Sequence, residues 1–472
     1  MTESPTNSDA VESDEVEQSL YARRKKIYPR EVHGMFAALR ASGVSILLGF
    51  YYIVPLLQWD GHQLVLFDLP ARKFYIFGMI FWPQDFFYLA MLLIVAALTL
   101  FFFTALAGRL WCGFACPQTV WTEAFLWIER KVEGDRPRQM KLDNEPWSLR
   151  KLRIKSTKHA IWILFSLYTG LTFVGYFSPM RELTTNFLHL NLGPWEFFWI
   201  FFYGFATYGN AGWLREQVCT YMCPYARFQS AMIDKDTLMI SYDEKRGEPR
   251  GRRKKGVDPE RESLGHCIDC TICVQVCPTG IDIRNGLQYE CIGCAACIDA
   301  CNDVMEKMNY PEGLIRYTTE HGLYGEKTRI LRPRIIVYGV ILMLITVGTF
   351  YAIATRMPLA LDVIRDRNTL FRETNEGMIE NVYILKIMNM DKQLRNYSLS
   401  VSGISGLTMY VDRTDIEVAS GEMINLPVRV RADPVELSKR SHEVVFNLIA
   451  NDSDDLYVAE EARFIGPLPQ RK

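Results

Sequence analysis

Eight of the twelve cysteines in the sequence form two runs with identical spacing. Gaps of two, two and three residues are typical of bacterial two-cluster ferredoxins, in which the fourth cysteine of each run binds the cluster of the other run. We therefore predict two [4Fe–4S] clusters, with zinc as the less favoured alternative. One cluster is assigned to Cys267, Cys270, Cys273 and Cys301, and the other to Cys291, Cys294, Cys297 and Cys277.

The remaining four cysteines lie in two copies of a C-x-x-x-C-P motif. The first copy, WCGFACPQ, contains Cys112 and Cys116, and the second, VCTYMCPYARFQ, contains Cys219 and Cys223. Cysteines four residues apart share one face of a helical turn, and a proline can begin the following helix. We expect the four thiols to converge as a metal site or a dithiol relay. Soft thiolates favour Cu(I), but the spacing does not choose between copper, a contact with a cluster and disulfide exchange.

Long apolar runs place these cysteines at a membrane. Runs of about twenty apolar residues cross a hydrocarbon core roughly 30 Å thick, and the sequence predicts five of them in an α-helical transmembrane bundle. The preceding polar and acidic segment lacks the pattern of a signal peptide and is expected to form a disordered tail. The five predicted spans are residues 36–57, 86–107, 160–177, 195–213 and 335–354.

Lysine and arginine predict the orientation of the spans, because they are enriched in cytoplasmic connections. They are abundant before the first span, in the 108–158 connection and in residues 214–334, and sparse in the connections between. The tail after the fifth span is therefore expected outside the cytoplasm, in a periplasm if the cell is Gram-negative. All twelve cysteines then lie on the cytoplasmic side or at its border, where thiols stay reduced.

The tail from residue 355 onward contains short alternating segments separated by turn residues. This spacing predicts an immunoglobulin-like β-sandwich without a disulfide, used as a docking module. The net charge of −1 gives no indication of a nucleic-acid partner. The predicted parts are a tail (1–35), two membrane hairpins (36–233), a ferredoxin-like module (234–334), a fifth span (335–354) and the sandwich (355–472).

Taken together, these motifs resemble the cytochrome c oxidase accessory proteins called CcoG, FixG or RdxA. The resemblance rests on WCGFACP, CTYMCPYARFQ, YDEKRGEPRG at Tyr242, the double ferredoxin run and the immunoglobulin-like tail. It implies a multi-pass bacterial inner-membrane protein that helps assemble cbb3-type oxidase, with oxidase subunits, copper chaperones or a copper transporter as partners. It further implies reduction of Cu(II) to Cu(I) with electrons from a cytoplasmic donor. The implied redox or copper positions are Cys112, Cys116, Cys219 and Cys223.

Two other functions stay open at this point. One is a quinol or ferredoxin electron-transfer subunit, because similar hairpins with CP motifs occur beside ferredoxins in membrane quinol dehydrogenases. The other is a non-catalytic assembly scaffold whose clusters sense the redox state.

Overall fold

A computed structural model describes residues 26–467, apart from residues 60, 256–262, 392 and 414–415. The chain divides into two units, which are described separately below. The first unit comprises Met1–Leu66 and Leu93–Met343, and the second comprises Phe67–Leu92 and Leu344–Lys472. Residues 1–25, most of the predicted disordered tail, lie outside the described part of the chain.

Three helices are long and apolar enough to cross a membrane among the described residues, and they match the first, second and fifth predicted spans. Their candidate membrane segments are Met35–Leu56, Pro83–Ala107 and Pro333–Ala354. Most of their side chains are exposed in the isolated chain, as expected for helices that face lipid. The helices are α2 (Met35–Ile53), α3 (Phe86–Ala107) and α15 (Pro333–Ala354).

The third and fourth predicted spans correspond to α7 (Leu149–Val174) and α9 (Pro194–Thr207), which are not among those three candidates. Helix α7 is long, but basic residues occupy its first turns. Helix α9 has 14 residues, a length of roughly 21 Å, and a π-helical segment, η3 (Tyr208–Leu214), continues it. The two helices pack closely at Gly170 of α7, where a side chain would collide with the backbone of Ile200. The count of five spans stays a prediction.

Helix α5 (Pro117–Glu133) joins α7 through a buried network of charges. Glu129 binds Arg215 at 2.8 Å and Lys158 at 3.2 Å, and Glu133 binds Lys158 at 2.7 Å. Burial opposes ionisation of Glu129, but Arg215 and Lys158 outweigh it and lower the pKa of that carboxyl to about 2. The network therefore pairs a basic side chain near the start of α7 with carboxylates of α5. This part of α7 consequently faces charged partners rather than lipid.

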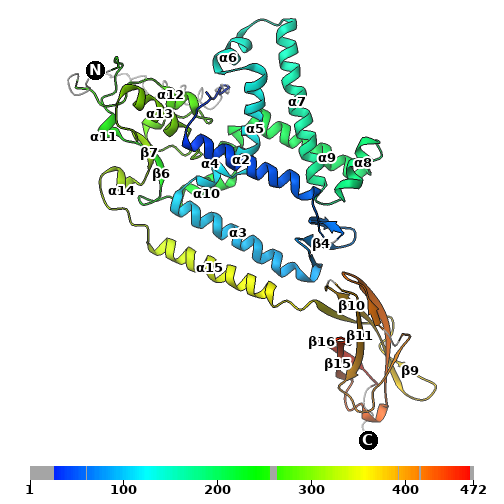
Figure 1. Ribbon diagram of the computed structural model, residues 1–472. Coiled ribbons are helices and arrows are strands. Elements are labelled where there is room, and N and C mark those ends of the chain that lie inside the picture. Colours follow the sequence, from blue (N-terminus) through cyan, green and yellow to red (C-terminus); the bar gives the residue numbers. More distant parts are fainter. Residues whose placement is uncertain (1–25, 60, 256–262, 392, 414–415, 468–472) are drawn as a thin grey trace, which may run out of the picture. The chain divides into compact units, whose positions relative to one another are not determined.

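The ferredoxin-like module lies beside the N-terminal end of α2 (Figure 1). Asp299 of α13 (Ala296–Met308) accepts hydrogen bonds from the amides of Phe36, at 3.2 Å, and Ala37, at 2.7 Å. A Cβ atom at Gly34 would lie 2.5 Å from the Asp299 side chain, so only glycine fits there. Asp299 thus caps α2 from a distant part of the sequence.

Residues 26–34 were included in the predicted disordered tail, but they make defined contacts. The Arg30 amide donates to the carbonyl of Gln275 at 2.8 Å, and the Tyr28 hydroxyl donates to Asp143 at 2.7 Å. This segment therefore connects the ferredoxin-like module to α6 (Arg136–Asn144).

Shorter elements complete the first unit. The ferredoxin-like module contains the antiparallel pair β6 (Met239–Tyr242) and β7 (Ile315–Thr318). The remaining helices are α4 (Leu110–Phe114), α8 (Met180–Leu188), α10 (Pro224–Ser230), α11 (Glu244–Gly247), α12 (Ile272–Val276) and α14 (Glu320–Leu323), and the remaining strands are β1 (Gln58–Trp59) and β2 (His62–Gln63).

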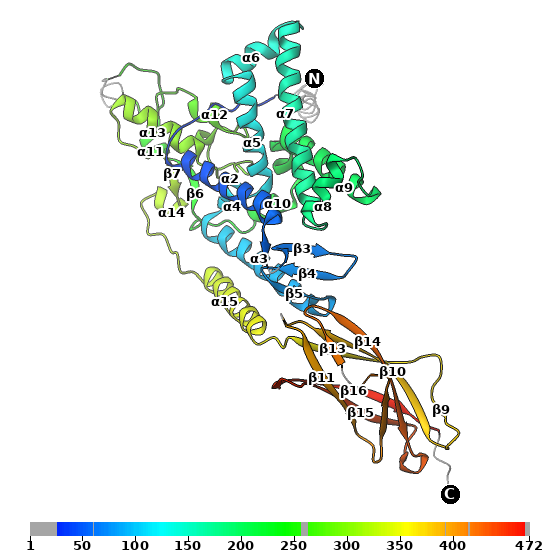
Figure 2. The same cartoon turned by 45° about the vertical axis from the view of Figure 1, so that its right-hand side comes forward.

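The second unit contains a sandwich of two antiparallel sheets (Figure 2). One sheet has the order β12-β14-β10-β8, with β9 paired to β10, and the other has the order β13-β11-β15-β16. The completely buried side chains of Tyr383, Phe446 and Phe464 fill the space between them. The strands are β8 (Leu359–Arg365), β9 (Arg372–Glu373), β10 (Ile379–Asn389), β11 (Arg395–Ser402), β12 (Thr408–Val411), β13 (Ile416–Val418), β14 (Met423–Ala432), β15 (Ser441–Ala450) and β16 (Ser453–Ile465).

The sequence did not predict β8 and β9, nor the small sheet of β3 (Val65–Asp68), β4 (Lys73–Ile76) and β5 (Met79–Phe81). Within the second unit, the β5 end of this sheet contacts the sandwich. Arg356 donates to the carbonyl of Ile80 at 3.1 Å, and a Cβ atom at Gly421 would lie 2.6 Å from the Ile80 side chain.

Replacing the cap of α2 provides a test of this packing. Asp299→Ala removes both acceptors and the negative charge at a helix N-terminus, so we expect a loss of about 1–2 kcal/mol of stability and a lower melting temperature of the full chain in detergent. Asp303→Ala, on the same helix but in an exposed pair with Lys307, should melt like the wild type. Equal melting of both variants would contradict the capping role.

Candidate metal centres

The four cysteines predicted to hold the first cluster line one small cavity. Cys267, Cys270, Cys273 and Cys301 surround it, and the rest of its wall is mainly apolar. Cys267 and Cys273 are buried and the other two are half-buried. The structure therefore brings together the three cysteines of the first run with the last cysteine of the second run.

A second cavity gathers the other four predicted ligands. It is lined by Cys277, Cys291, Cys294 and Cys297, and also by Cys273, which borders both cavities. Each cavity is thus lined by the first three cysteines of one run and the fourth cysteine of the other run, as the sequence predicts. The identity of the ligands stays a prediction.

The loops that carry the cysteines repeat the same backbone at an interval of 24 residues. Asp269 (φ 52°) and Thr271 (φ 57°) correspond to Gly293 (φ 70°) and Ala295 (φ 59°). Alternation of such left-handed residues with ordinary ones makes a concave row of backbone amides that binds anionic groups. The two loops therefore suit an anionic group held by thiolates.

Backbone amides of the second loop already point at the sulfur atoms. Burial raises the pKa of Cys291, and a hydrogen bond from the Gly293 amide partly offsets the increase. Burial likewise raises the pKa of Cys294 to about 12, and the Ala296 amide opposes it. Thiols with neighbouring amide donors, around a mainly apolar cavity, fit an iron–sulfur cluster.

The C-x-x-x-C-P motifs share one local structure. Cys112 lies in the short helix α4, and Cys219 lies in the π-helical segment η4 (Val218–Met222). Cys116 and Cys223 are extended, with ψ of 130° and 111°, and the proline after each begins a helix, α5 or α10. The prolines act as expected, but the shared helical face was wrong, because each helical segment ends before its second cysteine.

Side chains of each motif bind the other motif. The Cys112 thiol lies 3.8 Å from Oε1 and 3.6 Å from Nε2 of Gln229, which is completely buried. Gln118 donates to the carbonyls of Asn210, at 2.9 Å, and Arg215, at 3.1 Å. Arg109 donates to the carbonyl of Ala226 at 3.1 Å. The two copies therefore form one structure.

The four thiols also influence one another electrostatically. Burial raises the pKa of Cys112 to about 11 and that of Cys219 to about 12, and the other thiols of the group add to both increases. All four cysteines are half-buried. Among the described residues, no three His, Cys, Asp or Glu side chains are arranged to hold a single metal ion. Cys112 and Cys219 are thus each close enough to other cysteines of the two motifs for their charges to interact.

The four cysteines of the two C-x-x-x-C-P motifs are together called the thiol group below. A contact between glycines joins the thiol group to the second cluster loop. A Cβ atom at Gly113, between Cys112 and Cys116, would lie 2.6 Å from the carbonyl oxygen of Gly293 and 2.9 Å from Cα of Cys294. A Cβ atom at Gly293 would in turn lie 3.0 Å from the carbonyl oxygen of Arg109. The backbones of the first motif and the cluster loop are therefore in direct contact.

Several residues of this site were not predicted from the sequence. Arg215 adopts φ 45°, is buried, and is held by Glu129, and strained residues of this kind often mark functional sites. Gln118 and Gln229 were visible only as parts of the CPQ and CPYARFQ strings. Their role depends on contacts between the motifs, which no spacing indicates.

Comparisons with known proteins agree with these features. Family models for a 4Fe-4S dicluster domain, a 4Fe-4S binding domain and an IG-like fold at the C-terminal of FixG match residues 214–320, 89–134 and 349–467. The nitrogen fixation protein FixG of Rhizobium meliloti (strain 1021) is 39% identical over 442 residues, covering 86% of this chain and 84% of the relative. The chain belongs to the FixG family.

Two further FixG-family relatives come from Cereibacter sphaeroides. Protein RdxB is 40% identical over 84% of this chain and 85% of its own length, and protein RdxA is 39% identical over 88% and 89%. A crystal structure of a FixG-related protein from Vibrio parahaemolyticus has 36% identity and a TM-score of 0.22, and covers 24% of this chain and 100% of that one. The family models and the FixG relative show a FixG-like iron–sulfur protein with a C-terminal immunoglobulin-like domain, and three of its described helices are long and apolar enough to cross a membrane.

The glycine contact predicts a specific sensitivity. Gly113→Ala places a methyl group against the backbone of the cluster loop, so we expect a cost of about 1–3 kcal/mol and faster loss of iron to a chelator. Gly49→Ala, in a helix with no atom within 4 Å of the new Cβ, is the matched control. Iron loss at the wild-type rate from Gly113→Ala would contradict the contact.

Burial of the thiols predicts an unusual pH profile for alkylation. The thiolate is the reactive form, so Cys112, with a pKa of about 11, should react about tenfold faster per pH unit between pH 8 and pH 10. In the unfolded chain the rate should level off near pH 9, because an ordinary cysteine has a pKa of about 8.5. Peptide mass spectrometry after iodoacetamide treatment measures both, and the same plateau in the folded protein would contradict burial.

Proposed function

We propose that this chain reduces Cu(II) to Cu(I) at the four C-x-x-x-C-P thiols during assembly of a cbb3-type oxidase. The observation that carries the proposal is the contact of Gly113 with the backbone of Gly293 and Cys294. It connects four convergent thiols with a predicted cluster ligand inside one unit. An electron-transfer site beside a soft-ligand site is what reduction and capture of copper requires.

The residues of the thiol group divide the chemistry between them. Cu(II) is the substrate and needs one electron, which an iron–sulfur cluster supplies when bound. Cu(I) is then retained by soft sulfur, because thiolates prefer the reduced ion. Metal binding to thiols releases protons, because the thiolate is the ligand, and Gln229 lies beside Cys112, where it orients that thiol.

Contacts between loops support the proposed orientation in a bacterial inner membrane. Gln63, in the connection after the first span, donates to the carbonyl of Gly175 at the end of the third predicted span at 2.7 Å. Gln63 also accepts from the amide of Met180, in the following connection that is likewise predicted outside the cytoplasm, at 3.0 Å. Two segments predicted inside meet where Arg136 donates to the carbonyl of Tyr28 at 2.9 Å. Both contacts join segments that the five-span topology assigns to the same side.

The immunoglobulin-like domain is proposed to dock oxidase subunits, a copper chaperone or a copper transporter on the periplasmic side. The domain contains no cysteine, so its contribution is binding rather than redox chemistry. The matched family description likewise gives this IG-like fold at the C-terminal of FixG.

Copper reduction can be measured directly on the purified protein. The protein is reduced anaerobically, freed of reductant and mixed with Cu(II), and Cu(I) is detected with a chromogenic chelator. We expect about one Cu(I) per reduced cluster, and at least a tenfold loss when Cys112, Cys116, Cys219 and Cys223 are all replaced by Ser.

Iron content and the cluster absorbance of this variant provide its control, because the eight ferredoxin cysteines are unchanged. Full Cu(I) formation by the variant would contradict the role of the four thiols. Clusters that stay reduced in the wild type when Cu(II) is added would contradict copper reduction and leave the electron-transfer subunit and the scaffold as alternatives.

A further inference from the structure

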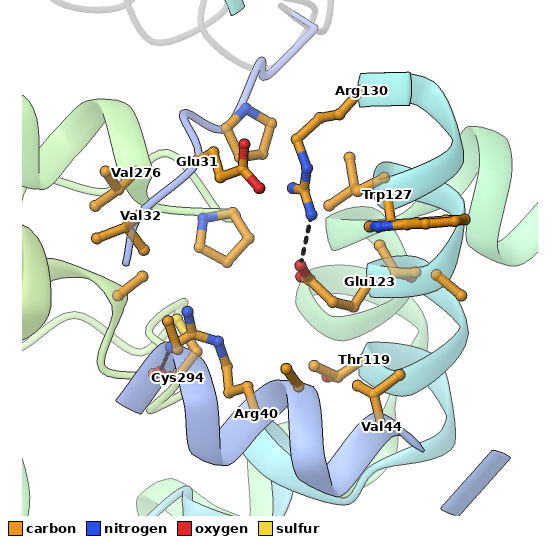
Figure 3. A pocket seen from close by; sticks show the side chains of 18 of the residues that line it. Glu31, Val32, Arg40, Val44, Thr119, Glu123, Trp127, Arg130, Val276 and Cys294 are labelled. Carbon is orange, nitrogen blue, oxygen red and sulfur yellow. Dashed lines mark hydrogen bonds and ion pairs between the residues drawn. The ribbon is translucent and has the colours of Figure 1, made fainter. Parts of the chain in front are cut away.

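A cavity of about 830 Å³ lies within the first unit, between α2, α5 and the second cluster loop. Figure 3 shows α2 and α5 on two sides, the chain segment with Glu31 and Val32 on a third, and Cys294 on the cluster side. Sites for small organic ligands commonly enclose about 300–1,000 Å³. The cavity is therefore large enough for a ring compound with part of an apolar tail.

The lining is amphiphilic. Val44 and Leu48 of α2, a candidate membrane span, and Phe165 of α7 supply apolar surface. Charged side chains occupy another part, where Arg130 donates to Glu123 at 3.0 Å. Figure 3 shows the carboxylate of Glu31 directed toward the same guanidinium.

One donor in this polar part has no partner. The Nε atom of Arg130 is buried and makes no hydrogen bond to any described residue, and its guanidinium extends into the cavity (Figure 3). Buried polar groups of this kind normally have a partner. An oxygen atom of a ligand would bind the part of the guanidinium that faces the cavity (Figure 3) and make up for this lost hydrogen bond.

A thiol from each redox site borders this cavity. Cys219 of the second C-x-x-x-C-P motif and Cys294 of the second cluster loop both line it. Arg40, on α2, donates to the carbonyl of Cys294 from the same wall. An electron carrier in this cavity would contact both the C-x-x-x-C-P thiols and the second cluster loop. A lipid that carries no electrons would have no chemical reason to contact them.

We propose that the cavity binds a membrane quinol, which supplies the electrons for the proposed copper reduction. The inference rests on the proposed function and replaces the predicted cytoplasmic electron donor with one from the membrane. Two hydroxyl O–H bonds break as the quinol becomes a quinone, which releases two electrons and two protons. The two protons pass to carboxylates such as Glu31 and Glu123 and then to water, and the two electrons reduce two Cu(II) ions.

Quinone binding can be measured without copper and without turnover. The probe is a photoreactive azido derivative of decylubiquinone, added to the full chain in lipid nanodiscs, with labelled peptides identified by mass spectrometry. We expect labels on α2 and α5 that excess decylubiquinone displaces. Labels only elsewhere, or none displaced, would overturn the proposal.

Substitution provides matched variants. Ala41→Trp fills the cavity, whereas Ser42→Trp changes the next residue of α2, which is exposed and does not line the cavity. We expect at least tenfold weaker quinone binding for Ala41→Trp and wild-type binding for Ser42→Trp. Thr122→Trp, from the α5 side, should repeat the loss if Ala41→Trp misfolds, and iron content reports folding.

Two further outcomes separate this proposal from others. Bound phospholipid that the quinone cannot displace, detected by native mass spectrometry, would overturn it. Wild-type protein that is reduced with dithionite and then freed of it tests the proposed function with no quinol present, so copper reduction without quinone binding refutes this inference alone.

Discussion

The contact of Gly113 with the backbone at Gly293 and Cys294 is the constraint on which the redox part of the structure depends. Gly113 has no room for a side chain, because the backbone of Gly293 and Cys294 occupies the space where its Cβ atom would lie, and a Cβ atom at Gly293 would lie 3.0 Å from the carbonyl oxygen of Arg109. A larger residue would separate the thiol group from the cluster loop, and electron transfer falls steeply with distance. The glycine in WCGFACP is thus explained by a contact with another module rather than by a turn.

Polar interactions hold the two partners of this contact in place. Asp299 fixes α2 to the ferredoxin-like module by capping its first amides. Glu129 fixes α5 to Arg215, four residues before Cys219. Buried ion pairs of this kind add little net stability but are costly to break, so their effect is to define one geometry. The two C-x-x-x-C-P motifs are consequently oriented by charges that lie outside both motifs.

The sequence predicted the structure best where the chemistry of an element requires a particular spacing of residues. Cysteine gaps in the two runs predicted the groups of four that line each cavity, and alternating residues predicted most strands of the sandwich. Contacts between distant segments were not predictable, because the connection between Cys223 and Cys267 permits either docking or separation. The helical face proposed for the cysteine pairs was wrong, since the proline after each second cysteine requires an extended residue before it. Hydropathy also predicted a fourth span where α9 has only 14 residues and a π-helical continuation.

Freeze-quench electron paramagnetic resonance gives the most direct test that the thiol site and the clusters form one electron path. Reduced protein is mixed anaerobically with one equivalent of Cu(II) per cluster, and both paramagnetic signals are followed in time. The two signals should decay together, at one Cu(II) per reduced cluster, and Gly113→Ala should slow both decays equally. Loss of the Cu(II) signal while the clusters stay reduced would contradict a path through the Gly113 contact.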